Sequence, residues 1–468
     1  MYNDLPAKHR WSVTAAIVVL PFFLSMTGGA MALEPTEEDY ALKLLGKYLF
    51  FDNISLPKRQ SCSSCHTPAA GWTNGTAGTN KNQVAVTGAD PHTVGTLKPP
   101  TSAYATLIPD FAILPGQFGG PFAGNFWNGR ATGEAVRDLK VLGEPGDPLH
   151  VKYAEYLGAA TDQAHASPFI NPVEQGLPDK IAVCEHVNSA KYAPLYAIAY
   201  EEPISCAAGD IDITFGRFAL AIGAFEFSGD VNQFASKRDI ALANDADGNF
   251  PLDGFTEQEN FGHDLFYGIT SDLNPAPSKN AGCGAFCHRS GNNQGTSPQE
   301  RYTGDGYFNI GVPRNVAIPG NPEPNEGVFF MTGDDGDKGA HKTPTLRNVD
   351  LRPGKGWTKA FMHNGYFKTL KGIVHFYNTS NVNGPTAAAF GVTRCDPGVG
   401  LTEEDALANN CWPEPEFTGN IPFFILGSRN LTDEEEKAIV SYMKTFSDPV
   451  TKAPKPFDLK KFNQEIPF

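Results

Sequence analysis

The chain has 468 residues, and its 52 acidic residues outnumber its 37 Lys and Arg, so its formal net charge at pH 7 is −15. A surface of this charge argues against nucleic-acid binding and favours encounter with a basic protein. The 48 glycines and 37 prolines predict a loop-rich fold, and the length predicts two or three domains.

The N-terminus has the order of residues expected of a secretory signal peptide. Basic residues at positions 8–10 precede an apolar run at 13–26, and the sequence Gly-Gly-Ala-Met-Ala follows at 28–32. We therefore predict a signal peptide at residues 1–32, cleavage after Ala32 and a periplasmic protein. Because the apolar run is short and interrupted by Pro21, we expect no membrane span after cleavage, with an uncleaved anchor as the alternative.

The first cysteine motif, Cys-Ser-Ser-Cys-His at residues 62–66, has the spacing used to attach a c-type haem. Cysteines three residues apart lie on one side of a helical turn, where both thiolates can reach the haem vinyl groups. The adjacent His66 can then ligate the iron. A zinc site would need two further ligands at a fixed distance, and none follows Cys65. We therefore predict covalent haem at Cys62, Cys65 and His66.

An internal repeat predicts the organisation of the chain. Stretches beginning at Thr36 and Thr256 each place an acidic residue three positions after the Thr, which is typical of a helix N-terminus. In both, a short amphipathic helix ends in a Leu-Phe step and leads to a cysteine motif 26 or 27 residues after the Thr. The repeat predicts a mainly α, loop-rich fold with two cytochrome c-like haem domains in tandem, at residues 33–245 and 246–468.

The second cysteine motif has one residue more than the first between its cysteines. It consists of Cys283, Cys287 and His288 and occupies the same place in the repeat. We therefore predict a second haem attachment site with an expanded loop, in which Gly282 and Gly284 accept backbone angles that other residues resist. A Cys283–Cys287 disulfide and a metal site are the alternatives.

The other four cysteines are expected to form disulfides, because free thiols tend to oxidise in an exported protein. They can pair in three ways. We favour the pairing with the shortest loops, Cys184 with Cys206 and Cys395 with Cys411.

Four further stretches, taken together with the two cysteine motifs, resemble the bacterial di-haem cytochrome c peroxidase and MauG superfamily. They are "NFWNGRATGEA" around Trp127, "PFINPVEQG" around Glu174, "HKTPTLRNVDL" from His341 and "FMHNGYFKTLKGIVHFYN" around Tyr377. The resemblance covers nearly the whole chain after the predicted signal peptide. It implies a peroxidatic haem at the first motif and an electron-relay haem at the second.

The resemblance also implies roles for individual residues. Trp127 resembles the tryptophan between the two haems, and Arg130 resembles a residue that holds a propionate. Glu174 resembles the distal carboxylate that handles the protons of peroxide, a task for which a nearby carboxylate is chemically suited. Pro168 and Gln163 match other residues of the distal pocket.

The sequence leaves two features of the family open, which are a distal ligand of the first haem iron and a calcium site. His92 is either a distal ligand of the first haem iron or a surface residue. Calcium, which members of the family usually bind through an Asn side chain and carbonyls, is uncertain because Lys98 stands at the Asn position and would repel the ion.

The sixth ligand of the second haem iron distinguishes the branches of the family, which use either Met or Tyr. The resemblance puts Tyr377 in this position, and Tyr377 continues the apolar face formed by residues 370, 373 and 374, whereas His375 points away. The alternative is a core Tyr377 with Met362 or Met331 as the ligand. A phenolate stabilises Fe(III) and lowers the potential, whereas a thioether favours Fe(II).

The favoured function is therefore a MauG-like, H2O2-dependent oxidation of an aromatic residue on a partner protein. A first alternative is a cytochrome c peroxidase that reduces H2O2 to water with electrons from a small cytochrome c or cupredoxin. A second is a non-catalytic di-haem electron carrier, against which Glu174 argues.

Overall fold

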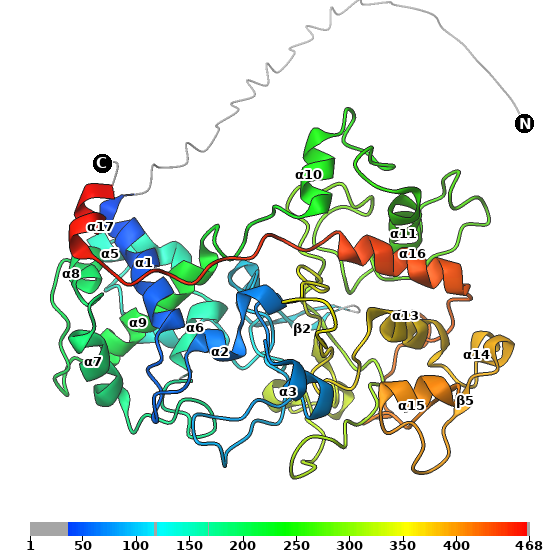
Figure 1. Ribbon diagram of the computed structural model, residues 1–468, viewed down its shortest axis with the longest axis horizontal. Helices are drawn as coiled ribbons and strands as arrows, with labels where there is room; N and C mark the ends of the chain where they lie inside the picture. The colour runs from blue at the N-terminus through cyan, green and yellow to red at the C-terminus, as the bar shows by residue number, and fades with distance from the viewer. Residues whose placement is uncertain (1–35, 117–118, 167, 466–468) are drawn as a thin grey trace, which may run out of the picture. The chain divides into compact units, whose positions relative to one another are not determined.

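The computed structural model describes residues 36–116, 119–166 and 168–465, and the predicted signal peptide lies outside these residues (Figure 1). Helices and long loops make up most of the described chain, in agreement with the predicted mainly α, loop-rich class. The helices of the first half are α1 (Glu37–Phe51), α2 (Cys62–Cys65), α3 (Ala77–Asn82), α4 (Ala135–Asp138), α5 (Pro148–Tyr153), α6 (Ala159–His165), α7 (Lys180–Ser189), α8 (Pro194–Tyr200), α9 (Ile211–Phe227) and α10 (Lys237–Asn244).

The second half contributes further helices and most of the short strands. The helices are α11 (Glu257–Tyr267), α12 (Phe329–Thr332), α13 (Leu370–Thr379), α14 (Pro385–Phe390), α15 (Glu403–Ala408), α16 (Asp433–Lys444) and α17 (Leu459–Glu465). Within the described ranges, the strands form three two-stranded sheets: β1 (Ala112–Leu114) with β2 (Gly120–Phe122) and β3 (Tyr307–Phe308) with β4 (His341–Lys342), both antiparallel, and β5 (Thr393–Arg394) with β6 (Cys411–Trp412), parallel.

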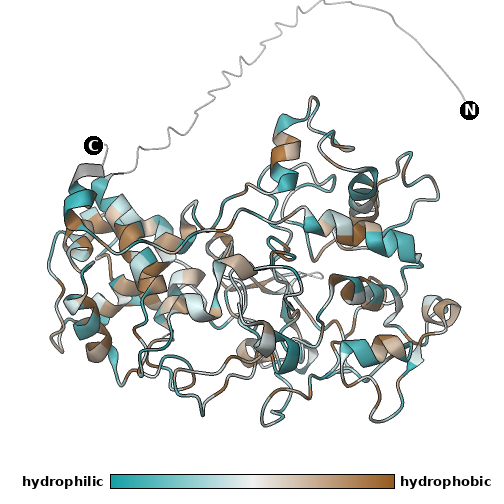
Figure 2. Ribbon diagram, viewed as in Figure 1, coloured by the Kyte–Doolittle hydropathy of each residue, from teal (hydrophilic) through white to brown (hydrophobic). Residues whose placement is uncertain are grey.

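The first hydrophobic core is built around the packing of α1 on α9. The Thr36 side chain accepts a hydrogen bond from the Asp39 N–H and so starts α1 where the sequence predicted. Gly46 allows the two backbones to approach closely, because a Cβ at this position would lie 1.7 Å from the Ala221 carbonyl oxygen. Apolar residues cover much of α9 (Figure 2), and this helix is buried over most of its length.

The second hydrophobic core repeats this arrangement with α11 and α16. Thr256 and Glu259 form the predicted capping box at the start of α11. Gly262 contacts α16 closely, since a Cβ there would lie 2.0 Å from the Ala438 carbonyl oxygen. Both halves of the internal repeat thus pair a glycine-bearing helix that precedes a cysteine motif with a helix from much later in the sequence.

The C-terminal segment returns to the first core. The Tyr48 hydroxyl donates to the Lys455 carbonyl, and the Phe462 side chain is buried in the first core. From residue 36 onwards the chain forms one compact unit, so the predicted boundary at residues 245 and 246 stays a prediction. None of the helices in the described parts of the chain is long and apolar enough to cross a membrane.

The disulfide pairing predicted from the shortest loops is confirmed. Cys184 bonds to Cys206, and Cys395 bonds to Cys411. The remaining four cysteines, all in the two predicted haem motifs, carry free thiols. The alternative disulfide between Cys283 and Cys287 is therefore not formed.

Candidate functional site

The first cysteine motif forms a single helical turn beside a cavity. Cys62 and Cys65 begin and end α2, and both line this cavity together with His66. The His66 Nδ1 lies 3.3 Å from the Trp72 carbonyl oxygen and 3.1 Å from the Ser102 hydroxyl. Burial lowers the pKa of His66 to about 4, so the ring is neutral, and the bonding of Nδ1 leaves the lone pair on Nε2. This is the state in which an imidazole ligates iron.

The second motif reaches a similar arrangement with one extra residue. The His66 N–H donates to the carbonyl of Cys62, four residues before it, and the His288 N–H donates to the carbonyl of Cys283, five residues before it. The added residue therefore widens one turn. Gly282 has φ +79°, in the left-handed region, as the sequence predicted, whereas Gly284 does not adopt such an angle and the expectation for it was wrong. Phe286 is one of the three residues between the two cysteines, and its side chain is 65% exposed.

His288 has the same orientation as His66 by the same means. Its Nδ1 lies 3.0 Å from the Tyr302 carbonyl oxygen, and burial lowers the pKa of His288 to about 4. Glu300 holds the chain on both sides of this contact, because its carboxylate accepts hydrogen bonds from the Ser290 and Tyr302 N–H groups. The Tyr302 ring stacks on Phe446 with ring centroids 3.8 Å apart.

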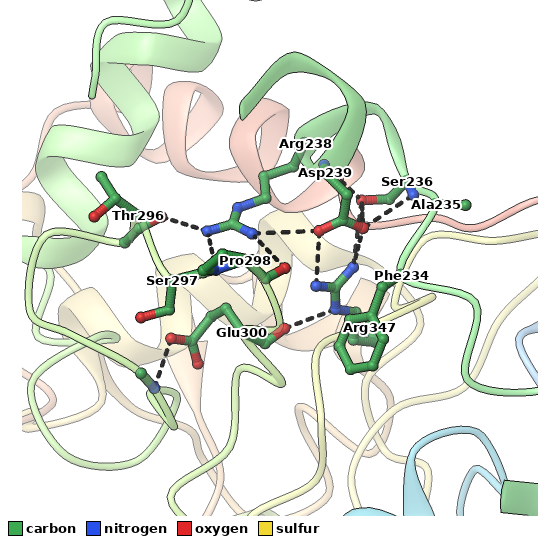
Figure 3. Close-up of polar contacts among 12 residues, drawn as sticks. Phe234, Ala235, Ser236, Arg238, Asp239, Thr296, Ser297, Pro298, Glu300 and Arg347 are labelled. Atoms are coloured by element: carbon green, nitrogen blue, oxygen red, sulfur yellow. Dashed lines mark hydrogen bonds and ion pairs between the residues drawn. The ribbon is translucent and has the colours of Figure 1, made fainter. Parts of the chain in front are cut away.

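A buried ionic cluster contacts the loop that contains Glu300. Figure 3 shows the Asp239 carboxylate between the guanidinium groups of Arg238 and Arg347. Arg347 also donates from Nε to the Glu300 carbonyl, and Arg238 donates to the Ser297 carbonyl. The cluster thereby connects α10 to the segment that orients His288.

The structure brings the residues of the predicted distal pocket into the first cavity. Gln163, Pro168 and Glu174 all line it together with the first cysteine motif, and so does Arg130, which was predicted to hold a propionate. The Arg130 guanidinium lies over the Phe126 ring, 3.6 Å from its centroid. These side chains come from α6, from the loop after it and from the loop before α4.

Glu174 combines access to solvent with a mostly protein environment. Solvent reaches its side chain at the cavity, yet the surrounding protein raises the pKa of Glu174 above its usual value, and the Arg130 charge opposes this rise. The Asn171 amide donates to Oε1 at 3.1 Å. The Glu174 carbonyl accepts from the Ala89 N–H at 2.7 Å, which fixes its backbone. A carboxyl group in this position can bind and release a proton inside the cavity.

The sequence reasoning missed Gln175, Glu226 and Ser102, which all line the first cavity. Gln175 donates from Nε2 to the Cys62 sulfur at 3.8 Å. Glu226 is buried on α9, where burial raises its pKa to about 8 and a hydrogen bond from Ser102 opposes the rise. The sequence contained a signal for Glu226, because it is a lone charge near the end of the apolar run of α9. No sequence signal pointed to Gln175.

His92 and Lys98 lie outside the first cavity. His92 is exposed on a turn in which its N–H donates to the Asp90 side chain, and it is absent from the cavity lining. Lys98 is buried, and its ammonium donates to the Thr73 hydroxyl and to the Pro99 carbonyl. Burial lowers the pKa of Lys98 to about 8. In the described ranges, no cluster of three or more His, Cys, Asp or Glu side chains could hold a metal ion, and calcium stays an open prediction.

A second, larger cavity contains the second cysteine motif and Tyr377. Cys283, Cys287, His288 and Tyr377 line it, and α13 supplies Tyr377 on the face that the sequence predicted. Burial and the two nearby thiols raise the pKa of Tyr377 above its usual value, so the phenol is neutral without a cation to stabilise its ionised form. Met362 also lines this cavity, whereas Met331 does not. His375 pairs with Glu436 at 3.0 Å and lies outside the lining.

Trp127 connects the surroundings of the two motifs. It is buried, lines the second cavity and donates from Nε1 to the Lys98 carbonyl at 2.8 Å. The Lys98 ammonium in turn contacts Thr73, which follows Trp72, the residue whose carbonyl faces His66. A short path of bonds and contacts thus joins the cavity of His288 to the backbone that orients His66.

These two sites fit the attachment of two haems. Each provides two free thiols, a neutral histidine fixed through Nδ1 and a cavity that contains all three. Cys62, Cys65 and His66 would hold the first haem, and Cys283, Cys287 and His288 the second. The sixth ligand of the second iron would come from Tyr377 or Met362.

Comparison with known proteins identifies relatives over most of the chain. Residues 41–247 match the family model described as di-haem cytochrome c peroxidase. The chain is 28% identical over 445 residues to methylamine utilization protein MauG of Paracoccus denitrificans, an alignment that covers 93% of this chain and 95% of MauG. It is 25% identical over 384 residues to cytochrome c551 peroxidase of Nitrosomonas europaea, with coverage of 80% and 86%.

Solved structures share the fold. The diheme peroxidase BthA from Burkholderia thailandensis aligns with a TM-score of 0.61 and 22% identity over 88% of this chain and 86% of BthA. A MauG-like protein associated with microbial copper homeostasis aligns with a TM-score of 0.54 and 21% identity over 90% and 93% of the two chains. The sequence matches show that the chain is an oxidoreductase similar to the di-haem cytochrome c peroxidases and MauG, and the solved structures show that it shares their fold.

Proposed function

We propose that the chain binds two c-type haems covalently and uses H2O2 to oxidise an aromatic residue on a partner protein, as the MauG branch would. The observation that carries the choice of branch is that Tyr377 lines the cavity of Cys283, Cys287 and His288. When bound, the haems supply irons that take oxidising equivalents from H2O2. The residues around the two cavities support a division of labour between them.

Glu174 is the proton carrier of the first site in this proposal. Its carboxyl group lines the cavity beside His66, and its surroundings give it a raised pKa. A carboxylate there takes a proton from one oxygen of H2O2 and delivers it to the other, which becomes the leaving water. Arg130 supplies a positive charge near the same cavity, where it would pair with a haem propionate.

Trp127 is the link between the two sites. Its indole is fixed by the bond from Nε1 to the Lys98 carbonyl, so that its ring stays in the wall of the second cavity. An aromatic ring held in place between two redox sites shortens the distance over which an electron must pass. The two hydrophobic cores, one for each cysteine motif, are consistent with the two predicted haem domains at residues 33–245 and 246–468.

The partner and compartment follow from the sequence. The predicted signal peptide supports a periplasmic reaction, and the net charge of −15 favours a basic partner protein. A second function, peroxidase activity with electrons from a small cytochrome c or cupredoxin, is favoured by one observation. Met362 lines the same cavity as Tyr377 and offers the thioether that such an enzyme would use.

The test replaces Tyr377 in the holoprotein. Tyr377→Phe keeps the ring and removes the phenol oxygen, so the low-spin ferric signal of the second haem in electron paramagnetic resonance should be lost. Tyr377→Met should restore a low-spin signal with a raised potential and increase turnover with a cytochrome c donor. Tyr40→Phe, at an exposed tyrosine, is the matched control. If Tyr377→Phe leaves the low-spin signal intact, Tyr377 is a core residue and Met362→Leu should remove the signal instead.

A further inference from the structure

A buried carboxyl group stands behind the first histidine and has no part in the function described so far. Glu226, on α9, is 7% exposed and lines the first cavity with Cys62 and His66. Its carboxyl group forms a hydrogen bond with the Ser102 side chain. The Ser102 oxygen lies 3.1 Å from the His66 Nδ1. Glu226, Ser102 and His66 therefore form a continuous row of hydrogen-bonding groups.

The internal repeat shows what stands in place of Ser102 at the second site. Residues 98–102, Lys-Pro-Pro-Thr-Ser, correspond to residues 342–346, Lys-Thr-Pro-Thr-Leu. The two segments have the same place in the structure, since Pro100 contacts the His66 ring through its backbone and Pro344 contacts the His288 ring in the same way. The serine of the first segment thus corresponds to Leu346.

The helices show what stands in place of Glu226. Gly46 of α1 packs on the Ala221 carbonyl of α9, and Gly262 of α11 packs on the Ala438 carbonyl of α16. Ala221 of α9 therefore corresponds to Ala438 of α16, and the other positions of the two helices can be matched from this pair. Glu226 lies five residues after Ala221, and the residue five positions after Ala438 is a methionine. The carboxyl group of the first site thus corresponds to the thioether of Met443.

The two sites therefore differ behind their histidines in one respect. The Trp72 carbonyl faces His66 as the Tyr302 carbonyl faces His288, so this contact is common to both. A polar pair, Ser102 and Glu226, is added at the first site. An apolar pair, Leu346 and Met443, lines the second cavity in the equivalent positions.

We propose that Glu226 and Ser102 are positioning residues that make His66 a stronger electron donor to its iron than His288. Ser102 has a single hydroxyl proton, and when it donates that proton to Glu226 its oxygen can only accept from the His66 Nδ1–H. The row Nδ1–H···Oγ–H···Oε keeps the lone pair on Nε2 and raises the basicity of the ligand. A more basic axial ligand stabilises the ferric state and lowers the potential of the first haem.

The test uses the holoprotein and rests on the proposed haem at the first motif. Glu226→Met gives the first site the residue of the second, and Glu226→Gln keeps an oxygen that can accept from Ser102. Glu185→Met, at an exposed residue of α7, is the control. The potentials of both haems are measured by spectroelectrochemical titration after intact mass has confirmed equal haem content.

Glu226→Met should shift the reduction equilibrium of the first haem about tenfold towards the reduced form, about 59 mV for a one-electron couple. The second haem should not move, and Glu226→Gln and Glu185→Met should match the wild type. Ser102→Ala, which breaks the row while Glu226 stays in place, should reproduce the shift even if Glu226→Met does not fold. An unchanged first potential in Glu226→Met or Ser102→Ala, or an equal shift in Glu226→Gln, would overturn the inference. Absence of haem from the first motif of the wild type would instead refute the proposed function.

Discussion

Replacing Glu174 with glutamine tests the proton chemistry assigned to the first cavity. Gln has the same shape, and its oxygen can still accept from the Asn171 amide, so the local geometry should persist. The variant loses only the group that binds and releases a proton. General acid–base catalysis contributes about 10² to 10⁴-fold to a rate. Because solvent reaches the Glu174 side chain and water can replace part of the transfer, we expect the lower end of this range.

The assay is stopped-flow measurement of the second-order reaction of the holoprotein with H2O2. Glu174→Gln should react about 100-fold more slowly, which corresponds to about 2.7 kcal/mol of activation free energy. Glu155→Gln, at an exposed residue, should react like the wild type.

The pH profile adds a second readout of the same group. The carboxylate is the form that accepts a proton, and the protein surroundings raise the pKa of Glu174. The wild-type rate should therefore fall as the pH is lowered through a midpoint above the ordinary glutamate value of about 4.3. The variant should lack this dependence. A Glu174→Gln rate within a factor of two of the wild type would assign Glu174 to structure alone.

Three further predictions concern the link between the sites and the stability of the fold. Trp127→Phe removes the indole and its bond to the Lys98 carbonyl, so electrons should pass more slowly to the first haem in single-turnover kinetics. The unfolding free energy should also fall by about 1 kcal/mol. An unchanged rate of electron passage would contradict the linking role. Arg347→Met leaves the Asp239 carboxylate buried with one partner fewer and should cost about 3 to 5 kcal/mol in urea unfolding, and a loss below 1 kcal/mol would show that Arg238 alone suffices. Replacing both Cys395 and Cys411 by serine should cost about 3 kcal/mol in the same experiment, and an unchanged midpoint would count against the bond's contribution.

Local sequence signals predicted the starts of the repeated helices and the disulfides. The Thr36 and Thr256 caps depend on residues only three positions apart, and the structure confirms both. The pairing of the four cysteines outside the two haem motifs was predicted from loop length, and it is also confirmed. These features depend on chain segments that are close in sequence.

Contacts between distant segments were beyond such reasoning. Ser102 reaches His66 across 36 residues, and Glu226 comes from a helix much later in the chain. No periodic pattern links these positions, because contacts between distant segments bring them together, such as the bond from the Ser102 N–H to the Trp72 carbonyl. The return of the C-terminal segment to the first core, where Phe462 is buried, was not predicted for the same reason.

The measurement that tests the central claim most directly is the intact mass of the purified mature protein. We predict residues 33–468 with two covalently bound haems, less the four hydrogens removed by the disulfides Cys184–Cys206 and Cys395–Cys411. A pyridine haemochrome spectrum should also show that both vinyl groups of each haem have reacted, including the one assigned to Cys283. A mass with a single haem, or with none at Cys283, Cys287 and His288, would contradict a relay between two haem sites.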